Sequence, residues 1–122
     1  MKSPIRWFEI PVSDFERAVR FYETVFAIYL HRESCPDFRL AVFPNLDDGI
    51  GGALCDLKLY QPGPSGVAIY LDGGNDLSVP LARVEAAGGK IVVGKTHISP
   101  KLGYMAFFED CEGNRIGLHS RN

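Results

Sequence analysis

The sequence has few cysteines, and they are scattered. Cys35, Cys55 and Cys111 lie far apart and form no C-x-x-C motif. An odd number of cysteines without close spacing is not typical of a disulfide framework or of a structural zinc site. We therefore expect a reducing environment for this chain.

Long apolar runs are missing too. No stretch approaches the roughly 20 apolar residues that cross a bilayer, which argues against a membrane partner. Lys2, Arg6 and Glu9 place charges where a signal peptide has an unbroken apolar block. The expected location is cytoplasmic.

An excess of positive charge is likewise absent. The chain has 13 Lys plus Arg against 15 Asp plus Glu, a formal charge of -2, and it contains no basic run. Nucleic acid is therefore not an expected partner. A P-loop, a glycine-rich dinucleotide fingerprint and a Ser/His/Asp series are also lacking. At 122 residues the chain has the length of a single domain, residues 1–122.

Periodic patterns are clear in the first half. An apolar, β-rich run over 5–12 predicts a strand, and Ser13 or Asp14 can cap a following helix. Apolar residues then recur at helical spacing over 15–26. Further strands are predicted over 28–32, 38–43 and 49–60, with turns over 34–37 and 44–48.

The second half repeats this order after a Pro/Gly-rich linker at 61–66. It predicts a strand over 67–71 and a helix over 77–87 that ends at Gly88 and Gly89, then strands over 90–93, 104–109 and 115–119. Two βαβββ modules, about 1–60 and 66–122, predict an α+β fold in which a partly closed barrel encloses an internal cleft.

Motifs along nearly the whole chain carry a family resemblance: Phe8 to Asp14, Phe21-Tyr22-Glu23, Val84 to Gly89, and Asp110 to Leu118. With the duplicated module, they resemble the vicinal-oxygen-chelate superfamily, which includes glyoxalase I (lactoylglutathione lyase), bleomycin-resistance proteins and extradiol dioxygenases. Members of this family commonly form dimers, so the resemblance implies a homodimer.

Metal-binding members of the family place one ligand on each of four strands. The resemblance assigns those places to Trp7, to one of residues 52–54, to Gly66 and to Gly117. Indole, alkyl and hydrogen side chains have no lone pair for a divalent ion. We therefore expect no metal at the family's usual site, and no cofactor.

Strand alternation suggests a catalytic pair. If Trp7 and Gly117 face the cleft, then Glu9 and His119 face it too, because residues two apart share a strand face. A carboxylate opposite an imidazole can act in general acid/base catalysis. The alternatives are a structural hydrogen bond, and a frayed terminus at His119.

Four residues are candidates for ligand binding. Trp7 and Tyr70 can line the cleft with flat aromatic surface, although Trp7 can also fill the vacated metal place as core. His97 lies in a predicted loop over 94–103, which can act as a lid or remain a solvated surface loop. Arg39 can attract an anionic group or form a salt bridge.

The expected function is binding of a small organic molecule in a metal-free cleft. One alternative is a glyoxalase-related lyase or isomerase that uses Glu9 and His119, with or without a displaced divalent metal. The other is sequestration of a toxic compound or antibiotic.

Overall fold

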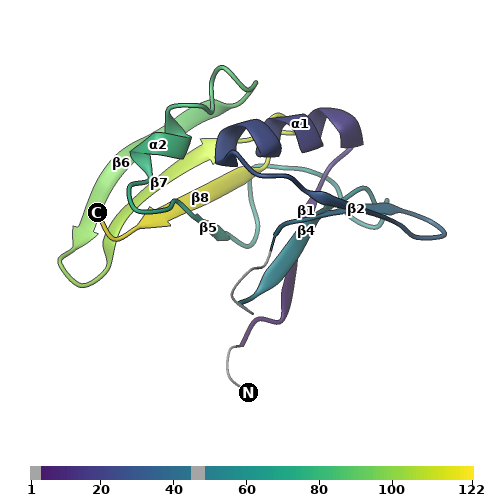
Figure 1. Cartoon of the computed structure of the whole chain (residues 1–122), viewed down its shortest axis with the longest axis horizontal. Coiled ribbons are helices and arrows are strands. Elements are labelled where there is room, and N and C mark those ends of the chain that lie inside the picture. Colours follow the sequence, from purple (N-terminus) through teal and green to yellow (C-terminus); the bar gives the residue numbers. More distant parts are fainter. Residues whose placement is uncertain (1–3, 45–48) are drawn as a thin grey trace.

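The computed structural model describes residues 4–44 and 49–122, which form two modules (Figure 1). The turn predicted over 44–48 lies almost entirely outside the described residues. The first module contains β1 (Trp7–Pro11), α1 (Phe15–Phe26), β2 (His31–Ser34), β3 (Arg39–Val42) and β4 (Gly51–Cys55). The second contains β5 (Tyr70–Asp72), α2 (Ser78–Leu81), β6 (Lys90–Ser99), β7 (Gly103–Glu109) and β8 (Arg115–Ser120).

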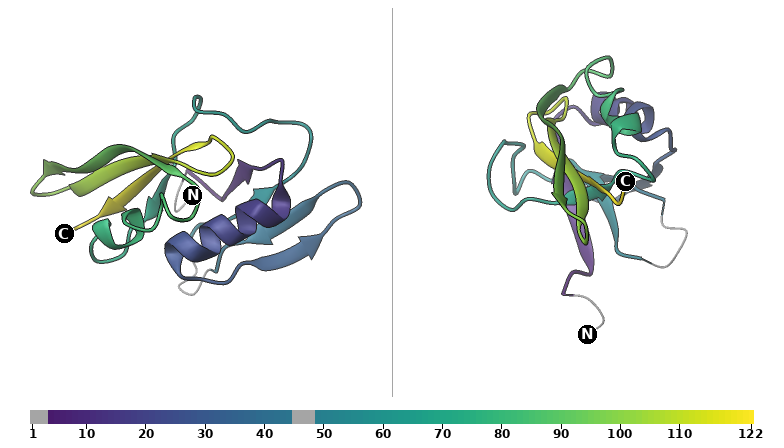
Figure 2. Two further views of the ribbon diagram at one scale, coloured as in Figure 1. Left: turned by 90° about the horizontal axis from the view of Figure 1, so that it is seen from above. Right: turned by 90° about the vertical axis from the view of Figure 1, so that its left-hand side faces the viewer.

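Each module forms one four-stranded sheet with the same topology. The strand orders are β1-β4-β3-β2 and β5-β8-β7-β6. In both sheets the first strand pairs parallel with the last, and the other pairs are antiparallel. The predicted α+β fold of two βαβββ modules is confirmed. Within the described ranges, the two sheets are not hydrogen-bonded into one barrel and lie side by side (Figure 2).

Helix α1 begins where its capping signal predicts. Asp14 is the N-cap, and its Oδ1 accepts a hydrogen bond from the backbone N–H of Arg17 at 3.2 Å. The side chains on its apolar face are buried: Phe15, Ala18, Val19, Phe21, Tyr22 and Val25. This face forms the centre of the hydrophobic core.

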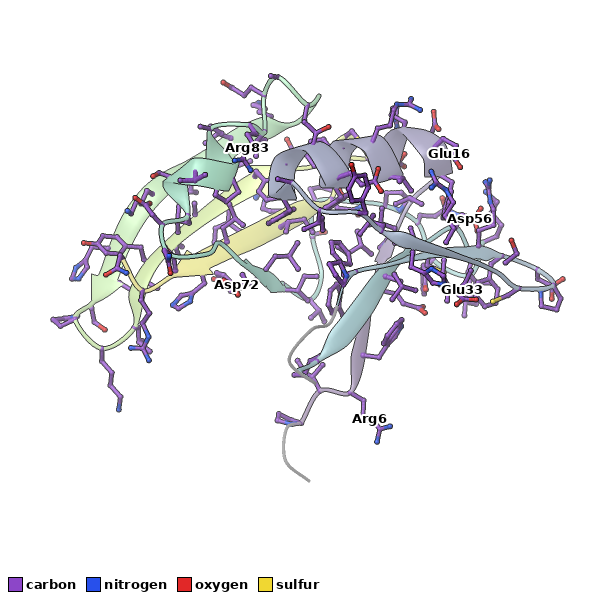
Figure 3. All side chains as sticks on the ribbon, in the orientation of Figure 1. Arg6, Glu16, Glu33, Asp56, Asp72 and Arg83 are labelled. Atoms are coloured by element: carbon purple, nitrogen blue, oxygen red, sulfur yellow. The ribbon has the colours of Figure 1, made fainter. Side chains whose placement is uncertain are left out.

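The core beneath α1 belongs to both modules. The Phe21 ring lies 6.0 Å, centroid to centroid, from that of Phe108 on β7. Arg83, which lies just after α2 (Figure 3), donates a hydrogen bond of 3.1 Å from its guanidinium to the Val25 carbonyl of α1. Helix α1 therefore joins the modules as well as covering its own sheet.

The second helix is shorter than the spacing over 77–87 predicts. After Leu81 the chain continues in turns, with the N–H groups of Arg83 and Val84 bonded to carbonyls three residues back at 3.0 and 3.2 Å. Pro80 lies in the first turn of α2, where a missing N–H is tolerated, so it does not account for the end of the helix at Leu81. Gly88 adopts φ 108°, as expected for the glycine that ends this segment.

The β6–β7 hairpin is longer than predicted, so the prediction of a loop over 94–103 is wrong. Strand β6 continues to Ser99, with Thr96 paired to Met105 and His97 paired to Tyr104. The lid expected around His97 is therefore part of a strand. Pairing with β7 outweighs the breaking tendency of Gly94, and Gly103, at φ 78°, follows a tight turn of three residues.

Three other strands have shifted limits. Strand β5 starts at Tyr70 rather than at 67, because Val67 is 95% exposed and lies outside the ladder with β8. Strand β4 ends at Cys55 rather than at 60, where Asp56 turns to accept a backbone hydrogen bond from Arg39 at 2.6 Å. Strand β2 runs from His31 to Ser34 rather than over 28–32.

No helix within residues 4–44 and 49–122 has both the length and the apolar character to cross a membrane.

Candidate functional site

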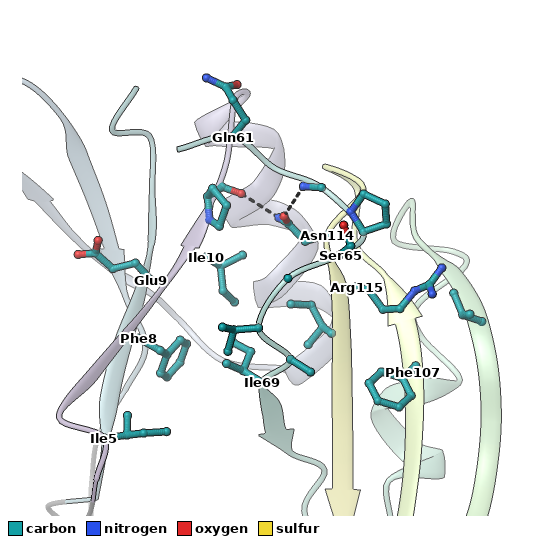
Figure 4. A pocket seen from close by; sticks show the side chains of 18 of the residues that line it. Ile5, Phe8, Glu9, Ile10, Gln61, Ser65, Ile69, Phe107, Asn114 and Arg115 are labelled. Atoms are coloured by element: carbon teal, nitrogen blue, oxygen red, sulfur yellow. Dashed lines mark hydrogen bonds between the residues drawn. The ribbon is translucent and has the colours of Figure 1, made fainter. Parts of the chain in front are cut away.

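A cleft of about 790 Å³ lies between the two modules (Figure 4). Strand β1 forms one wall, residues 61–69 run along one edge, and β6 to β8 form the opposite wall. Phe8 and Ile10 point from β1 toward the side of the cleft where Phe107 lies. The rest of the lining is also mainly apolar, with Val67, Ile69, Val92, Val93 and Ile116. Such a surface suits the apolar body of an organic molecule.

Asn114 fixes the linker to β1 at one end of the cleft. Its Nδ2 donates to the Pro11 carbonyl at 2.8 Å, and its Oδ1 accepts from the Gly63 N–H at 3.0 Å (Figure 4). Nδ2 also donates to Asp110 at 3.0 Å. Because the side chain is 5% exposed and has partners on every side, it shapes the cleft and is not free to bind a ligand.

The Asp110 carboxylate fixes the position of Asn114 by accepting hydrogen bonds from its backbone N–H and its Nδ2. The Asp110 carboxylate accepts from the buried Tyr22 hydroxyl at 2.7 Å. Burial raises the pKa of Asp110, although hydrogen bonds from Tyr22 and Asn114 oppose the rise. Burial, followed by the charge of Asp110, raises the pKa of Tyr22 well above its usual value. This network sets the position of the turn over 110–114, where Gly113 has φ 84° as expected for a β-turn.

Glu9 and Trp7 share one strand face, as alternation predicts. The Trp7 indole N–H donates to Glu9 at 3.2 Å, and the Tyr60 hydroxyl donates to the other Glu9 oxygen. Burial, followed by hydrogen bonds to Cys55 and Glu9, raises the pKa of Tyr60. Glu9 is one of the residues that line the cleft, but its carboxylate points away from Phe8 and Ile10 (Figure 4).

His119 and Tyr70 line a different, smaller hollow of about 440 Å³. The His119 ring is hydrogen-bonded through Nε2 to the Leu102 carbonyl. The Tyr70 ring lies 5.2 Å from Phe107, centroid to centroid, on the face of the second sheet. This arrangement does not bring the Glu9 carboxylate and the His119 imidazole together, and their catalytic roles stay predictions.

Arg39 and His97 lie outside the lining of the cleft. Arg39 forms the salt bridge left open as its alternative, with Nε 3.0 Å from Asp56, and its guanidinium covers the Phe15 ring at 4.4 Å. His97 packs edge-on against Tyr104, at 5.1 Å between ring centroids. The nearby Lys95 is paired with Asp76 at 2.8 Å.

Sequence reasoning missed Phe107, Asn114 and Arg115. A signal for the first and last was available, because strand alternation puts Phe107 on the same sheet face as Gly117 and Arg115. No local signal reveals Asn114, since its contact with Pro11 spans 103 positions of the sequence.

The fold and this cleft define a duplicated βαβββ protein with an apolar cavity between its modules. The chain belongs to the Glyoxalase/Bleomycin resistance protein/Dioxygenase superfamily, whose family model matches residues 5–118. It is 27% identical over 116 residues to a glyoxylase-like domain-containing protein of Didymella fabae, covering 93% of this chain and 90% of that one.

Two solved structures from Streptomyces sp. CB03234 are similar over almost the whole chain. One is TnmS3, an antibiotic-binding protein, with 25% identity and a TM-score of 0.73, covering 98% of this chain and 97% of that chain. The other is a glyoxalase/bleomycin resistance protein, with 26% identity and a TM-score of 0.73, covering 93% and 97%.

The side chains present do not fit the family's divalent ion. The side chains of Trp7, of residues 52–54, of Gly66 and of Gly117 offer no lone pair. The Tyr70 ring occupies the space beside the last place, since a Cβ on Gly117 would lie 2.5 Å from it. In the described part of the chain, no three His, Cys, Asp or Glu residues are grouped to hold a metal ion.

Proposed function

We propose that this protein binds a flat, mainly apolar organic molecule in the cleft between its modules without converting it. The observation that carries the proposal is the lining of the 790 Å³ cleft, with Phe8 and Ile10 on one wall and Phe107 on the other. The volume accommodates a ligand of two or three fused rings. The hydrogen bonds of Asn114 hold the linker in place, so much of the site exists before a ligand enters.

Thermal unfolding with the neutral probe N-phenyl-1-naphthylamine tests this proposal. At 100 times its dissociation constant, the probe is expected to stabilise the native state by about 2.7 kcal/mol. Phe107→Ala removes an aromatic wall and is expected to weaken binding. Tyr29→Ala removes an aromatic residue that is 90% exposed and outside the cleft, so it should leave binding unchanged. No stabilisation of the wild type, or equal effects of both variants, would contradict the proposal.

We favour sequestration of an antibiotic or other toxic compound as the biological role of this ligand binding. The similarity to TnmS3, which is described as antibiotic-binding, supports it. Expression in a sensitive bacterial host should raise the inhibitory concentration of an aromatic antibiotic, and the compound should be recovered chemically intact. Recovery of a product, lost in Glu9→Gln or His119→Ala, would instead favour the lyase or isomerase alternative.

A homodimer is also part of the proposal. Leu59 and Val67 are 83% and 95% exposed, which is unusual for large apolar side chains and provides surface for a second copy. Light scattering should give about twice the chain mass of 13.5 kDa. A mass that stays at one chain across concentrations would contradict this part alone.

A further inference from the structure

Arg115 is a cation in the lining of the cleft with no partner among the described residues. It begins β8 and is exposed, and its side chain forms no hydrogen bond or ion pair with any residue of 4–44 or 49–122. Three other arginines form salt bridges outside the cleft: Arg17 with Glu112, Arg32 with Glu16, and Arg39 with Asp56. A guanidinium left unpaired beside apolar walls is available to a ligand.

The placement of Arg115 relative to the apolar surface sets what it can bind. Phe107 pairs with Gly117, and Glu109 pairs with Arg115, so Phe107 and Arg115 share one face of the second sheet. Figure 4 shows them one above the other on the same wall. A flat molecule packed on Phe107 therefore has one end near the guanidinium.

The acidic groups near the cleft do not cancel this charge by contact. The Glu9 carboxylate is on the opposite wall, points away, and accepts hydrogen bonds from Trp7 and Tyr60. Glu109 is directly opposite Arg115 in the ladder but forms no ion pair with it. The chain as a whole carries a formal charge of -2, so attraction of an anion has to be local.

We propose that Arg115 binds the anionic group of the ligand, which makes the preferred ligand class an aromatic carboxylate or sulfonate. This inference rests on the proposed function, because it needs the cleft to hold an aromatic body. It goes further by assigning a charge to the ligand and a residue that recognises this charge.

The test compares two probes that differ by one sulfonate. These are 8-anilino-1-naphthalenesulfonate and its neutral analogue N-phenyl-1-naphthylamine, both followed by fluorescence titration. Arg115→Gln is expected to weaken binding of the sulfonate roughly three- to ten-fold and to leave the neutral probe unchanged. Arg115→Lys, which keeps the charge, should retain most of the affinity. Raising the salt concentration should weaken only the sulfonate.

Two variants serve as matched controls. Arg20→Gln makes the same change of charge on the exposed side of α1, away from the cleft, and should have no effect on either probe. Glu109→Gln removes the acid opposite Arg115 and should strengthen sulfonate binding.

The outcomes separate the two levels of the argument. If the wild type binds the neutral probe in the cleft but Arg115→Gln leaves sulfonate binding unchanged, the role of Arg115 is wrong and the proposed function stands. Equal weakening of both probes would also overturn it, because it indicates packing rather than charge recognition. If neither probe binds, the proposed function fails and this inference fails with it.

Discussion

Helices α1 and α2 occupy corresponding places in the two modules, yet α1 has 12 residues and α2 has 4. The buried face of α1 reaches Phe108 of the second module, whereas α2 buries only Pro80 and Leu81. The strands differ in the opposite sense, since β6 has 10 residues and β2 has 4. The long helix α1 thus contributes to the core of both modules. The second module has a short helix and a long β6–β7 hairpin, which forms part of one wall of the cleft.

The largest expected effect comes from removing the contact that joins the modules. Phe21 is 1% exposed, and Gly89 packs so closely that a Cβ there would lie 2.8 Å from the Phe21 ring. Phe21→Ala should lower the free energy of unfolding by about 3 to 5 kcal/mol, through lost burial and a cavity. Urea denaturation measures it, and both modules should unfold in one transition.

Val79→Ala is the control for Phe21→Ala in the other helix. Val79 is 54% exposed on α2, so its truncation should change stability by less than about 0.5 kcal/mol. Similar losses in the two variants would mean that α1 does not dominate the core.

Glu112 is the second connection between the modules. Its side chain is 1% exposed and lies at the start of α1, where it accepts hydrogen bonds from the Ser13 hydroxyl at 2.6 Å and the Asp14 N–H at 2.9 Å. It also pairs with Arg17 at 2.7 Å. Glu112→Gln should cost about 1 to 3 kcal/mol at pH 7. Glu16→Gln, a matched change at an exposed carboxylate of the same helix, should have a much smaller effect.

The pH dependence of these variants has a definite sign. Burial raises the pKa of Glu112, but hydrogen bonds from Ser13 and then Asp14 outweigh it, and the net pKa is lowered from 4.5. The stabilisation is therefore present above the unfolded pKa and is lost as pH falls through the folded one. The difference between wild type and Glu112→Gln should narrow below about pH 4.5. A constant difference down to pH 3 would show that the charge of Glu112 is not responsible.

Substitutions at two glycines can compare how tightly the first strand of each module packs against the last strand of the same module. A Cβ on Gly52 would lie 2.2 Å from the Phe8 ring, and one on Gly117 would lie 2.5 Å from the Tyr70 ring. Phe8 is half-buried and packs on the core, whereas Tyr70 is 51% exposed and can swing outward. Gly52→Ala should cost about 1 to 3 kcal/mol, and Gly117→Ala less than about 1 kcal/mol, by thermal unfolding. The reverse order would mean that the Tyr70 ring is held more firmly than its exposure suggests.

The first module was the more predictable of the two from sequence. Its helix carries its own cap and a regular apolar face, so local signals and tertiary packing agree over 15–26. In the second module they conflict. The apolar spacing favours a helix over 77–87, but the chain tightens into turns after Leu81. Cross-strand pairing extends β6 through Gly94, which locally favours a loop.

Sequence alternation indicated which side chains share a face within one strand, but not which of them form a site. Alternation placed Trp7 and Glu9 on one face, and their hydrogen bond confirms it. The relation between strands of different modules was not predictable in this way. Glu9 and His119 line separate hollows. Asn114 enters the cleft from the turn over 110–114, whose tertiary contacts leave no periodic signal.

The helix ends offer a smaller contrast. Helix α1 is followed by its C-cap Ala27, whose φ of 54° is a left-handed conformation that costs a residue with a Cβ about 1 kcal/mol. The second module uses Gly88 at φ 108° instead. Ala27→Gly should stabilise the protein by roughly 0.5 to 1 kcal/mol, and Gly88→Ala should destabilise it by a similar amount or more. Thermal unfolding measures both, and a destabilised Ala27→Gly would show that the Ala27 methyl contributes packing that outweighs its strain.

The last prediction is that adding Zn²⁺ or Ni²⁺ to untagged protein has no effect on its stability. The two modules lack metal ligands for different reasons. The first presents the Trp7 indole and only hydrogen or alkyl side chains at 52–54, and the second presents glycine at 66 and 117. The unfolding temperature should not move, and dialysis should leave much less than one ion per chain. His31→Ala removes the exposed His31–Glu33 pair, at 2.8 Å, as a surface site. One ion per chain that is retained in His31→Ala but lost in Glu9→Ala or His119→Ala would contradict the expectation that neither module supplies metal ligands. Such an ion would require side chains of both modules to meet in a metal site between them.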